Sequence, residues 1–291
     1  MGKPELQLFE THRRLMFSIA YRMLGSASEA EDILQEAFLR YQTMPSREIH
    51  SPKALLSTIV TRLCLNRLES AHYQRETYIG RWLPEPILTD NQTSDAGQRI
   101  ELHESISMAF LILLEQLTPL ERAVFLLRQV FDYEYAEIAE MVDKDETACR
   151  QLFSRAKKHI AEHRPRFRSS PEKHRELLEQ FMTAVSRGEL DGLLALLSDE
   201  VTLWADGGGK VRGAALHPVH GREAVVRFVI ASPYLAMGPL EPRIALVNEE
   251  PSLLLSIDGE IRFVVMINTD QTLIHEIRVI GNPDKLRGVS E

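Results

Sequence analysis

Apolar residues recur at intervals of three and four positions in the first part of the chain, and this spacing predicts helices. Three helices are expected before position 80, with apolar faces formed in order by Leu8, Leu15, Ile19 and Met23; by Ile33, Leu34, Ala37, Phe38 and Tyr41; and by Leu55, Leu56, Ile59, Leu63 and Leu68. The first helix should end near Gly25, Ser28 should cap the second, and Pro52 should open the third. We therefore predict an all-helical first domain over residues 1–80.

The helical periodicity stops over residues 81–104. From Trp82 to Gly97 the chain is rich in Pro, Asp, Asn, Thr and Ser, a composition typical of a linker. Helical spacing then returns, so a second helical domain is expected over residues 105–167.

The second domain has the pattern of a helix-turn-helix. Thr118 is a predicted helix cap, followed by Pro119 and Glu121 in the first turn. A short helix carrying Ile138 follows a break near Tyr133. Asp143 stands at the turn after it and tolerates a left-handed backbone better than most residues. The next helix starts after Asp145, which we expect to be its cap.

This last helix has one apolar and one polar face. Ala148, Leu152, Ala156 and Ile160 recur at every fourth position and are predicted to be buried, beside Cys149 and Phe153. The polar face predicts DNA binding, because arginine pairs with guanine, glutamine with adenine, and lysine or serine with phosphates. Its expected DNA-binding residues are Thr147, Arg150, Gln151, Ser154, Arg155 and Lys158. The alternative is a solvated helix in a bundle.

Charge distribution favours the DNA-binding interpretation. The chain carries a net charge of −8, yet the segment from Glu146 to Arg168 holds seven Arg or Lys against two acids. The sequence shows no membrane span, secretion signal, cofactor motif or zinc-ligand spacing, so we expect a cytoplasmic protein without a metal. The two cysteines, Cys64 and Cys149, are predicted to be buried free thiols.

A different pattern follows over residues 172–291. A helix from His174 and a short helix at Leu190–Leu197 precede five alternating, strand-like runs, which are Val201–Trp204, Arg243–Val247, Ser252–Ile257, Arg262–Ile267 and Ile274–Val279. This order predicts a multidomain chain that ends in an α+β cone, in which a curved antiparallel sheet surrounds a cavity.

The order of these motifs over residues 5–165 resembles an extracytoplasmic function (ECF) sigma factor of RNA polymerase. The resemblance implies that the first domain binds core polymerase and the promoter −10 element, and that the helix-turn-helix binds the −35 element. Segment 28–41 looks like the polymerase-binding helix, with contacts at Asp32, Gln35, Glu36 and Phe38. Segment 52–75 looks like the promoter-melting helix, with −10 contacts at Arg62, Asn66, Arg67, Ser70 and Arg75. A solvated acidic helix and structural arginines are the respective alternatives.

Three short motifs resemble the SigJ-like subgroup of these factors, which carries a fused SnoaL-like domain of the NTF2-like cone type. They are WLPEP in the linker, DGGGK after the first strand, and NPDKL near the end. The resemblance implies regulation of the sigma factor by its own C-terminal domain. The implied regulatory residues are Trp82, Leu83, Pro84, Asp206, Gly207, Gly208, Gly209, Lys210, Asn282, Pro283, Asp284, Lys285 and Leu286.

Two other functions stay open from the sequence. One is a ligand-responsive DNA-binding regulator that does not bind core polymerase, and the C-terminal domain leaves room for an unidentified small-molecule ligand. The other is ketosteroid-isomerase-like or cyclase-like chemistry in the cone, which needs a base and a hydrogen-bond donor in a dry cavity. Its candidate residues are Asp206, His217, His220, Tyr234 and His275, with Trp204 as a cavity wall. We expect no enzymatic activity and no catalytic residue.

Overall fold

The computed structural model describes residues 3–43, 51–76, 78–89, 106–163, 169–233 and 240–289. The chain divides into two compact units. The first joins Met1–Glu76 to Asp95–Arg164, and the second joins Thr77–Ser94 to Pro165–Glu291. The beginning of the predicted linker thus belongs to the same unit as the C-terminal domain.

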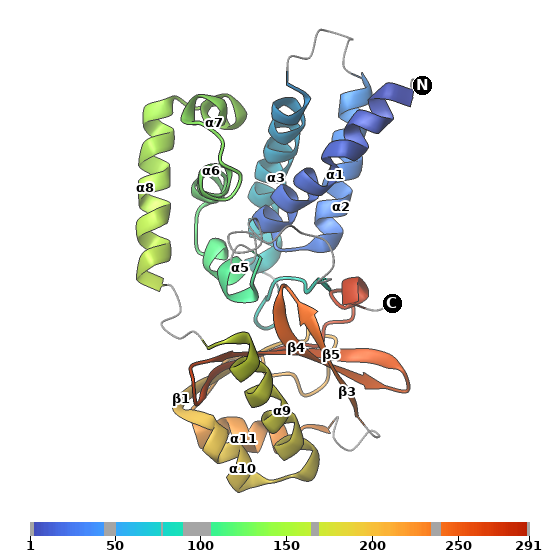
Figure 1. The fold of residues 1–291 in the computed structure, drawn as a ribbon, viewed down its shortest axis with the longest axis vertical. Coiled ribbons are helices and arrows are strands. Elements are labelled where there is room, and N and C mark those ends of the chain that lie inside the picture. Colours follow the sequence, from blue (N-terminus) through green and yellow to red (C-terminus); the bar gives the residue numbers. More distant parts are fainter. Residues whose placement is uncertain are drawn as a thin grey trace. The chain divides into compact units, whose positions relative to one another are not determined.

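The N-terminal half of the first unit contains helices α1 (Lys3–Leu24), α2 (Ala27–Thr43) and α3 (Pro52–Glu76) (Figure 1). Their packed faces bury apolar residues at the predicted spacing, including Ile19, Ile33 and Leu63. Gly25 ends α1 at a φ of 69°. The predicted cap of α2 was wrong by two residues, because the Ser26 hydroxyl and not that of Ser28 accepts from the Glu29 amide, at 3.2 Å.

The helix-turn-helix prediction matches helices α5 (Met108–Glu115), α6 (Pro119–Gln129), α7 (Tyr135–Val142) and α8 (Glu146–His163). Thr118 and Glu121 form a reciprocal capping box at the start of α6. Asp143 adopts the predicted left-handed conformation, with φ 55°, and the Asp145 carboxylate accepts from the Ala148 amide at 2.7 Å.

One detail of the buried face of α8 was wrong. The fully buried residues are Cys149, Leu152, Ala156 and Ile160. Ala148 is only partly buried, because the three-residue step from Cys149 to Leu152 keeps the stripe over the core at the start of the helix. Both cysteines are free thiols and buried, as predicted.

Polar contacts join the two halves of the first unit. Arg62 on α3 donates to the backbone carbonyls of Glu140 and Met141 on α7, at 2.7 and 3.1 Å. The hydroxyls of Ser57 and Tyr133 lie 2.7 Å apart. These bonds stabilise the packing of α3 against the helix-turn-helix.

The second unit is α+β, as predicted. Helices α9 (Pro171–Arg187), α10 (Leu190–Leu196) and α11 (Arg222–Ile230) pack on one side of a sheet (Figure 1). The sheet has six strands in the order β2-β1-β6-β5-β4-β3, with bounds β1 (Leu197–Asp206), β2 (Val219–His220), β3 (Glu241–Val247), β4 (Glu250–Ile257), β5 (Glu260–Thr269) and β6 (Ile274–Ile280).

The sheet differs from the predicted antiparallel one at a single pairing, because β1 and β6 run parallel. Parallel neighbours need a long crossover, which the intervening elements supply here. Helix α11 was not predicted either, although Val225, Val226 and Val229 have helical spacing after Gly221. A short 3₁₀ helix, η2 (Arg287–Val289), ends the described part of the chain.

The linker adds to this sheet at its β3 edge. Leu88 forms an antiparallel bridge with Val247. The Thr89 amide donates to the Leu246 carbonyl, and the Asn248 amide donates to the Ile87 carbonyl, both at 2.9 Å. An exposed strand edge offers unpaired backbone groups, and here the chain's own linker occupies part of it.

Candidate functional sites

The polar face of α8 is exposed along its length. Arg150, Arg155 and Lys158 keep 58%, 67% and 79% of their side-chain surface accessible. Thr147, Gln151 and Ser154 are exposed beside them. The described part of the helix therefore presents all six predicted DNA-binding side chains to solvent.

Arg150 is held in position by neighbouring side chains. Its guanidinium lies 4.4 Å from the centre of the Tyr135 ring and 2.6 Å from a Glu146 carboxylate oxygen. Phe153 packs edge-on against the same tyrosine. Stacking on an aromatic ring limits the rotamers of the arginine, which favours a directional contact such as a bidentate bond to guanine.

The predicted polymerase-binding residues lie on α2 with unequal exposure. Asp32 and Gln35 are exposed, and Glu36 forms an ion pair with Arg40 at 2.7 Å. Phe38 is partly buried, and its ring packs edge-on against Phe9 with centroids 4.8 Å apart. Phe38 therefore contributes to the packing of α1 against α2, while the acidic residues face solvent.

The predicted −10 residues on α3 also divide into two kinds. Asn66 and Ser70 are exposed, and Arg67 lies 4.0 Å from Glu29. Arg62 already donates to two carbonyls at the end of α7, so its guanidinium has a structural role in this conformation. The side chain of Arg75 lies outside the described residues.

The three short motifs of the linker and C-terminal domain meet around one carboxylate. Asp206 is fully buried at the end of β1. Its Oδ1 accepts from the Tyr78 hydroxyl at 2.5 Å and the Gly208 amide at 3.1 Å. Its Oδ2 accepts from the Leu83 amide at 2.8 Å and the Lys285 ammonium at 2.7 Å. Donors on both oxygens satisfy the hydrogen-bonding capacity of this buried carboxylate.

Lys285 is the cationic partner in this arrangement and is nearly buried, with 10% of its side chain accessible. Its ammonium also donates to the Leu83 carbonyl. The same nitrogen lies 4.1 Å from the centre of the Trp82 ring and 5.1 Å from that of Tyr78. One lysine thus binds the linker through a carbonyl and two aromatic faces.

Tyr78 completes the arrangement. It donates to Asp206, and its oxygen accepts from the Asn282 side-chain amide at 2.9 Å. Burial and the hydrogen bond to Asp206 raise the pKa of Tyr78 above its usual range, so the hydroxyl stays protonated as a donor. We name this set the linker-binding cluster; its members are Tyr78, Trp82, Leu83, Asp206, Gly208, Asn282 and Lys285.

The DGGGK glycines permit close approach within this unit. A Cβ atom on Gly208 would lie 2.3 Å from the Asn282 side-chain nitrogen, and one on Gly209 would lie 3.0 Å from Ile79. Both glycines have positive φ, at 57° and 71°. Backbone amides of Gly281 and Asn282 donate to the Asp206 carbonyl, at 2.9 and 3.0 Å.

The other motif residues are less uniform. Leu83, Pro84 and Leu286 are buried, as is Gly207, whereas Pro283 is exposed. Lys210 and Asp284 form an ion pair of 2.5 Å with about half of each side chain accessible. An exposed ion pair therefore lies a few residues along the chain from the buried ion pair of the linker-binding cluster.

The candidates for cone chemistry among the described residues are not assembled into one site. His217 and His220 are exposed, and His275 pairs with Asp270 at 2.7 Å. Tyr234 lies outside the described residues. The prediction that Trp204 walls the cavity was wrong: Leu203 and Ala205 line it, and strand alternation turns Trp204 to the other face, where Arg81 lies 5.0 Å from its ring centre.

Comparisons with known proteins agree with the two-part helical unit. The chain matches the family models of Sigma-70 region 2 at residues 8–72 and Sigma-70, region 4 at residues 107–160. It is 39% identical over 227 residues to the ECF RNA polymerase sigma factor SigJ of Mycobacterium tuberculosis (strain ATCC 25618 / H37Rv), covering 78% of this chain and 72% of that relative. The chain belongs to the ECF sigma factors.

Two further comparisons extend this result. A probable ECF sigma factor, SigI of Mycobacterium tuberculosis (strain CDC 1551 / Oshkosh), is 35% identical over 204 residues, covering 68% of each chain. The crystal structure of Mycobacterium tuberculosis SigJ aligns with 97% of this chain and 98% of its own, at 33% identity and a TM-score of 0.74. The similarity to that solved structure thus includes the C-terminal unit.

As an ECF sigma factor, this protein binds core RNA polymerase and promoter DNA and directs transcription initiation. Such factors are not enzymes. None of the described helices is long and apolar enough to cross a membrane.

Sequence reasoning missed two parts of the linker contact. Tyr78 is not among the predicted site residues, although it binds Asp206. The Ile87–Thr89 segment was assigned to the linker without a strand. Tyr78 lies four residues before WLPEP, and that proximity was the only available signal.

Proposed function

We propose that the C-terminal unit regulates this ECF sigma factor by binding the linker between region 2 and region 4. The observation that carries the proposal is the Asp206 carboxylate, which accepts bonds from Tyr78 just before the linker, from Leu83 of the linker and from Lys285 of the NPDKL motif. One buried group thus connects all three motifs. The linker connects regions 2 and 4 in the sequence, so we infer that holding it affects how the two regions engage a promoter.

The energetics of a buried ion pair support a switch of this kind. Removing one partner of such a pair leaves an uncompensated charge and costs about 3–5 kcal/mol. The intact pair contributes far less net stability, since its desolvation offsets much of the attraction. The linker can therefore be bound specifically without being bound irreversibly.

Covalent connection makes a modest interface sufficient. A segment tethered by a short linker experiences an effective concentration of about a millimolar. The antiparallel bridge at Leu88 and the apolar contacts of buried Leu83 add to the polar bonds. A partner or signal that competes for any of these contacts would shift the balance between bound and released linker.

The assignment of individual promoter and polymerase contacts is part of the proposal. Arg150 and Gln151 on α8 specify −35 bases, while Lys158 binds phosphate. Asp32 and Gln35 on α2 bind core polymerase. Asn66, Arg67 and Ser70 on α3 bind the −10 strand, which Arg62 joins only when it leaves the α7 carbonyls.

Run-off transcription with purified core polymerase tests the regulatory role. We expect that deleting Asn282–Glu291, which removes Asn282 and Lys285 from the linker-binding cluster, changes transcript yield while circular dichroism shows a folded protein. A chain lacking only Ser290 and Glu291 is the control. Equal yields from the full-length and both shortened proteins would refute regulation by the tail.

The same assay distinguishes a sigma factor from the alternative, a DNA-binding regulator that works without core polymerase. Tight binding of the purified protein to duplex promoter DNA, with no transcription from any shortened or full-length form, would favour that alternative. The expected result is the opposite: weak duplex binding alone and promoter-specific transcripts with core polymerase.

A further inference from the structure

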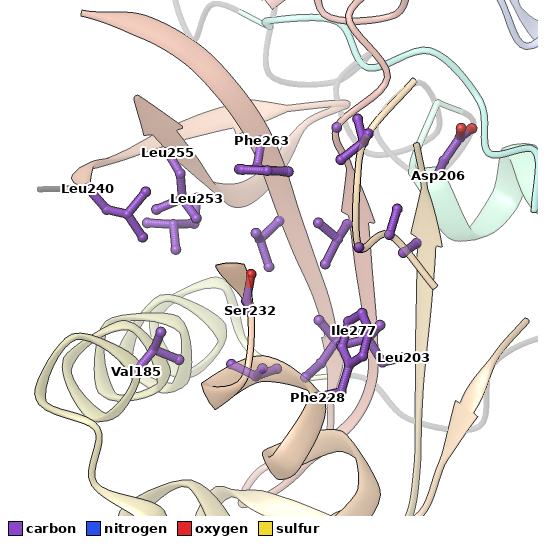
Figure 2. A pocket seen from close by; sticks show the side chains of 18 of the residues that line it. Val185, Leu203, Asp206, Phe228, Ser232, Leu240, Leu253, Leu255, Phe263 and Ile277 are labelled. Atoms are coloured by element: carbon purple, nitrogen blue, oxygen red, sulfur yellow. The ribbon is translucent and has the colours of Figure 1, made fainter. Parts of the chain in front are cut away.

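The α+β unit contains a partly open cavity of about 120 Å³ between its helices and its sheet (Figure 2). Phe181 and Val185 of α9 and Phe228 of α11 line it from the helical side. Leu253 of β4 and Ile277 of β6 line it from the sheet. Protein interiors are close-packed and contain few voids larger than a water molecule, so an apolar space of this size is a candidate ligand site.

The cavity wall is almost entirely apolar. Among the described side chains that line it, only Asp206 and Ser232 carry polar atoms. Figure 2 shows the Asp206 carboxylate directed away from the apolar side chains and the Ser232 hydroxyl directed toward them. All four donors described for Asp206 belong to the linker-binding cluster, so its carboxylate is engaged there.

These properties restrict the chemistry of an occupant. A buried charge without a partner is strongly unfavourable, so a carboxylate or ammonium ligand is excluded from a wall of this kind. An apolar cavity of about 150 Å³ in another protein stays dry and binds benzene. A space of comparable size here fits one hydrocarbon ring.

We propose that this cavity binds a small uncharged molecule built on one hydrocarbon ring, with at most one hydrogen-bonding group that meets the Ser232 hydroxyl. The wall belongs to the second unit, whereas the proposed promoter and polymerase contacts lie on helices of the first. The site also differs from a catalytic site, because the described part of its wall offers no carboxylate or histidine other than Asp206, which is engaged in the linker-binding cluster. Ligand binding in this cavity does not depend on whether the C-terminal unit regulates the sigma factor through the linker.

Thermal unfolding of the full-length protein tests the site with three matched probes: toluene, p-cresol and p-toluate. Because a ligand that binds only the folded state raises Tm, toluene and p-cresol should raise it in a concentration-dependent way. The p-toluate anion has the same ring with a charge and should leave Tm unchanged. No rise with either neutral probe up to its solubility limit, or an equal rise with p-toluate, would overturn the proposal.

Variants locate the binding. Val185→Trp fills the cavity and should abolish the toluene-induced rise, whereas Leu190→Trp adds the same ring at an exposed position and should retain it. Val229→Phe, on α11, fills the cavity from another side and replaces Val185→Trp if that protein does not fold. A full toluene response in a folded cavity-filling variant would place the binding elsewhere and refute the site.

The role of Ser232 is tested separately. Ser232→Ala should weaken p-cresol binding about fivefold, the equivalent of one neutral hydrogen bond, and leave toluene binding unchanged. Unchanged affinity for p-cresol would contradict the assigned hydrogen bond. Equal loss for both probes would contradict it too, since toluene cannot form that bond.

Discussion

The polar face of α8 and the linker-binding cluster both depend on charged side chains, but they satisfy those charges in different ways. On α8, Arg150, Arg155 and Lys158 keep more than half of their side-chain surface accessible. Arg150 and Lys158 pair with acids on the same helix, and Arg155 pairs with Glu121 of α6. In the cluster, Asp206 and Lys285 are buried, with bonds from distant parts of the chain.

This difference indicates where each region finds its partner. Exposed pairs within a helix contribute about 0.3–0.5 kcal/mol, so a guanine base can replace Glu146 beside Arg150 at little cost. Separating buried partners is much more costly. The α8 face is thus suited to an external ligand, and the cluster to a segment of its own chain.

The largest expected effect follows from neutralising the buried carboxylate. Asp206→Asn leaves the Lys285 ammonium without its ionic partner and should destabilise the bound linker by about 3–5 kcal/mol. Hydrogen exchange measures this, because the Leu83 amide donates directly to Asp206. Its exchange should become much faster.

Lys210→Met provides the matched control for that experiment. It breaks the exposed pair with Asp284 in the same unit. The free energy that holds the linker in its bound state should change by about 0–1 kcal/mol. Similar exchange rates of the Leu83 amide in Asp206→Asn and Lys210→Met would contradict the claim that the buried ion pair holds the linker more strongly than the exposed pair does.

A glycine comparison tests the close packing of the cluster. Gly208→Ala places a Cβ atom 2.3 Å from the Asn282 nitrogen, whereas Gly259→Ala, at φ 77°, meets nothing within 4 Å. Both changes strain the backbone, but only the first displaces Asn282 from Tyr78. Urea unfolding should show an additional loss of about 1–3 kcal/mol for Gly208→Ala. Equal losses of unfolding free energy in Gly208→Ala and Gly259→Ala would mean that the close contact between Gly208 and Asn282 does not contribute to stability.

On α8, Arg150→Ala and Gln151→Ala should each cost about 1–3 kcal/mol in recognition of the preferred −35 sequence and relax the preference at one base position. Transcription from promoters with single −35 substitutions measures both effects. A uniform decrease on all promoters would assign these side chains to phosphate contact.

The smallest effect is expected for Lys158→Ala. Loss of one phosphate contact should weaken all sequences alike and reduce the slope of log affinity against log salt by about 0.9. Salt titration of holoenzyme binding to promoter DNA gives this slope. A changed base preference with an unchanged slope would contradict the phosphate role.

The two regions also differ in how far the sequence predicted them. The helix-turn-helix depends on local signals, such as the Thr118 capping box and the turn at Asp143, which lie within a few residues of the groups they stabilise. The face of α8 follows from helical spacing alone. Local signals can also mislead: in the N-terminal half, the cap of α2 was misplaced because Ser26 and Ser28 are equally suitable residue types.

The linker-binding cluster depends on contacts between residues far apart in the chain. Tyr78 and Asp206 are separated by 128 positions, and Leu83 and Lys285 by 202. Motif resemblance grouped WLPEP, DGGGK and NPDKL by function, but no local pattern indicated that one carboxylate joins them. The parallel pairing of β1 with β6, which brings Asp206 next to Ile280, is likewise a property of the whole sheet.

The most direct test of regulation by linker binding is run-off transcription by core polymerase with full-length Lys285→Met and Lys210→Met proteins. Every 1.4 kcal/mol corresponds to about a tenfold change in an equilibrium. We expect Lys285→Met, which removes the buried cation, to change promoter-specific yield several-fold while Lys210→Met matches the unmodified protein. Equal yields from all three proteins, with hydrogen exchange showing the linker released in Lys285→Met, would contradict regulation through this cluster.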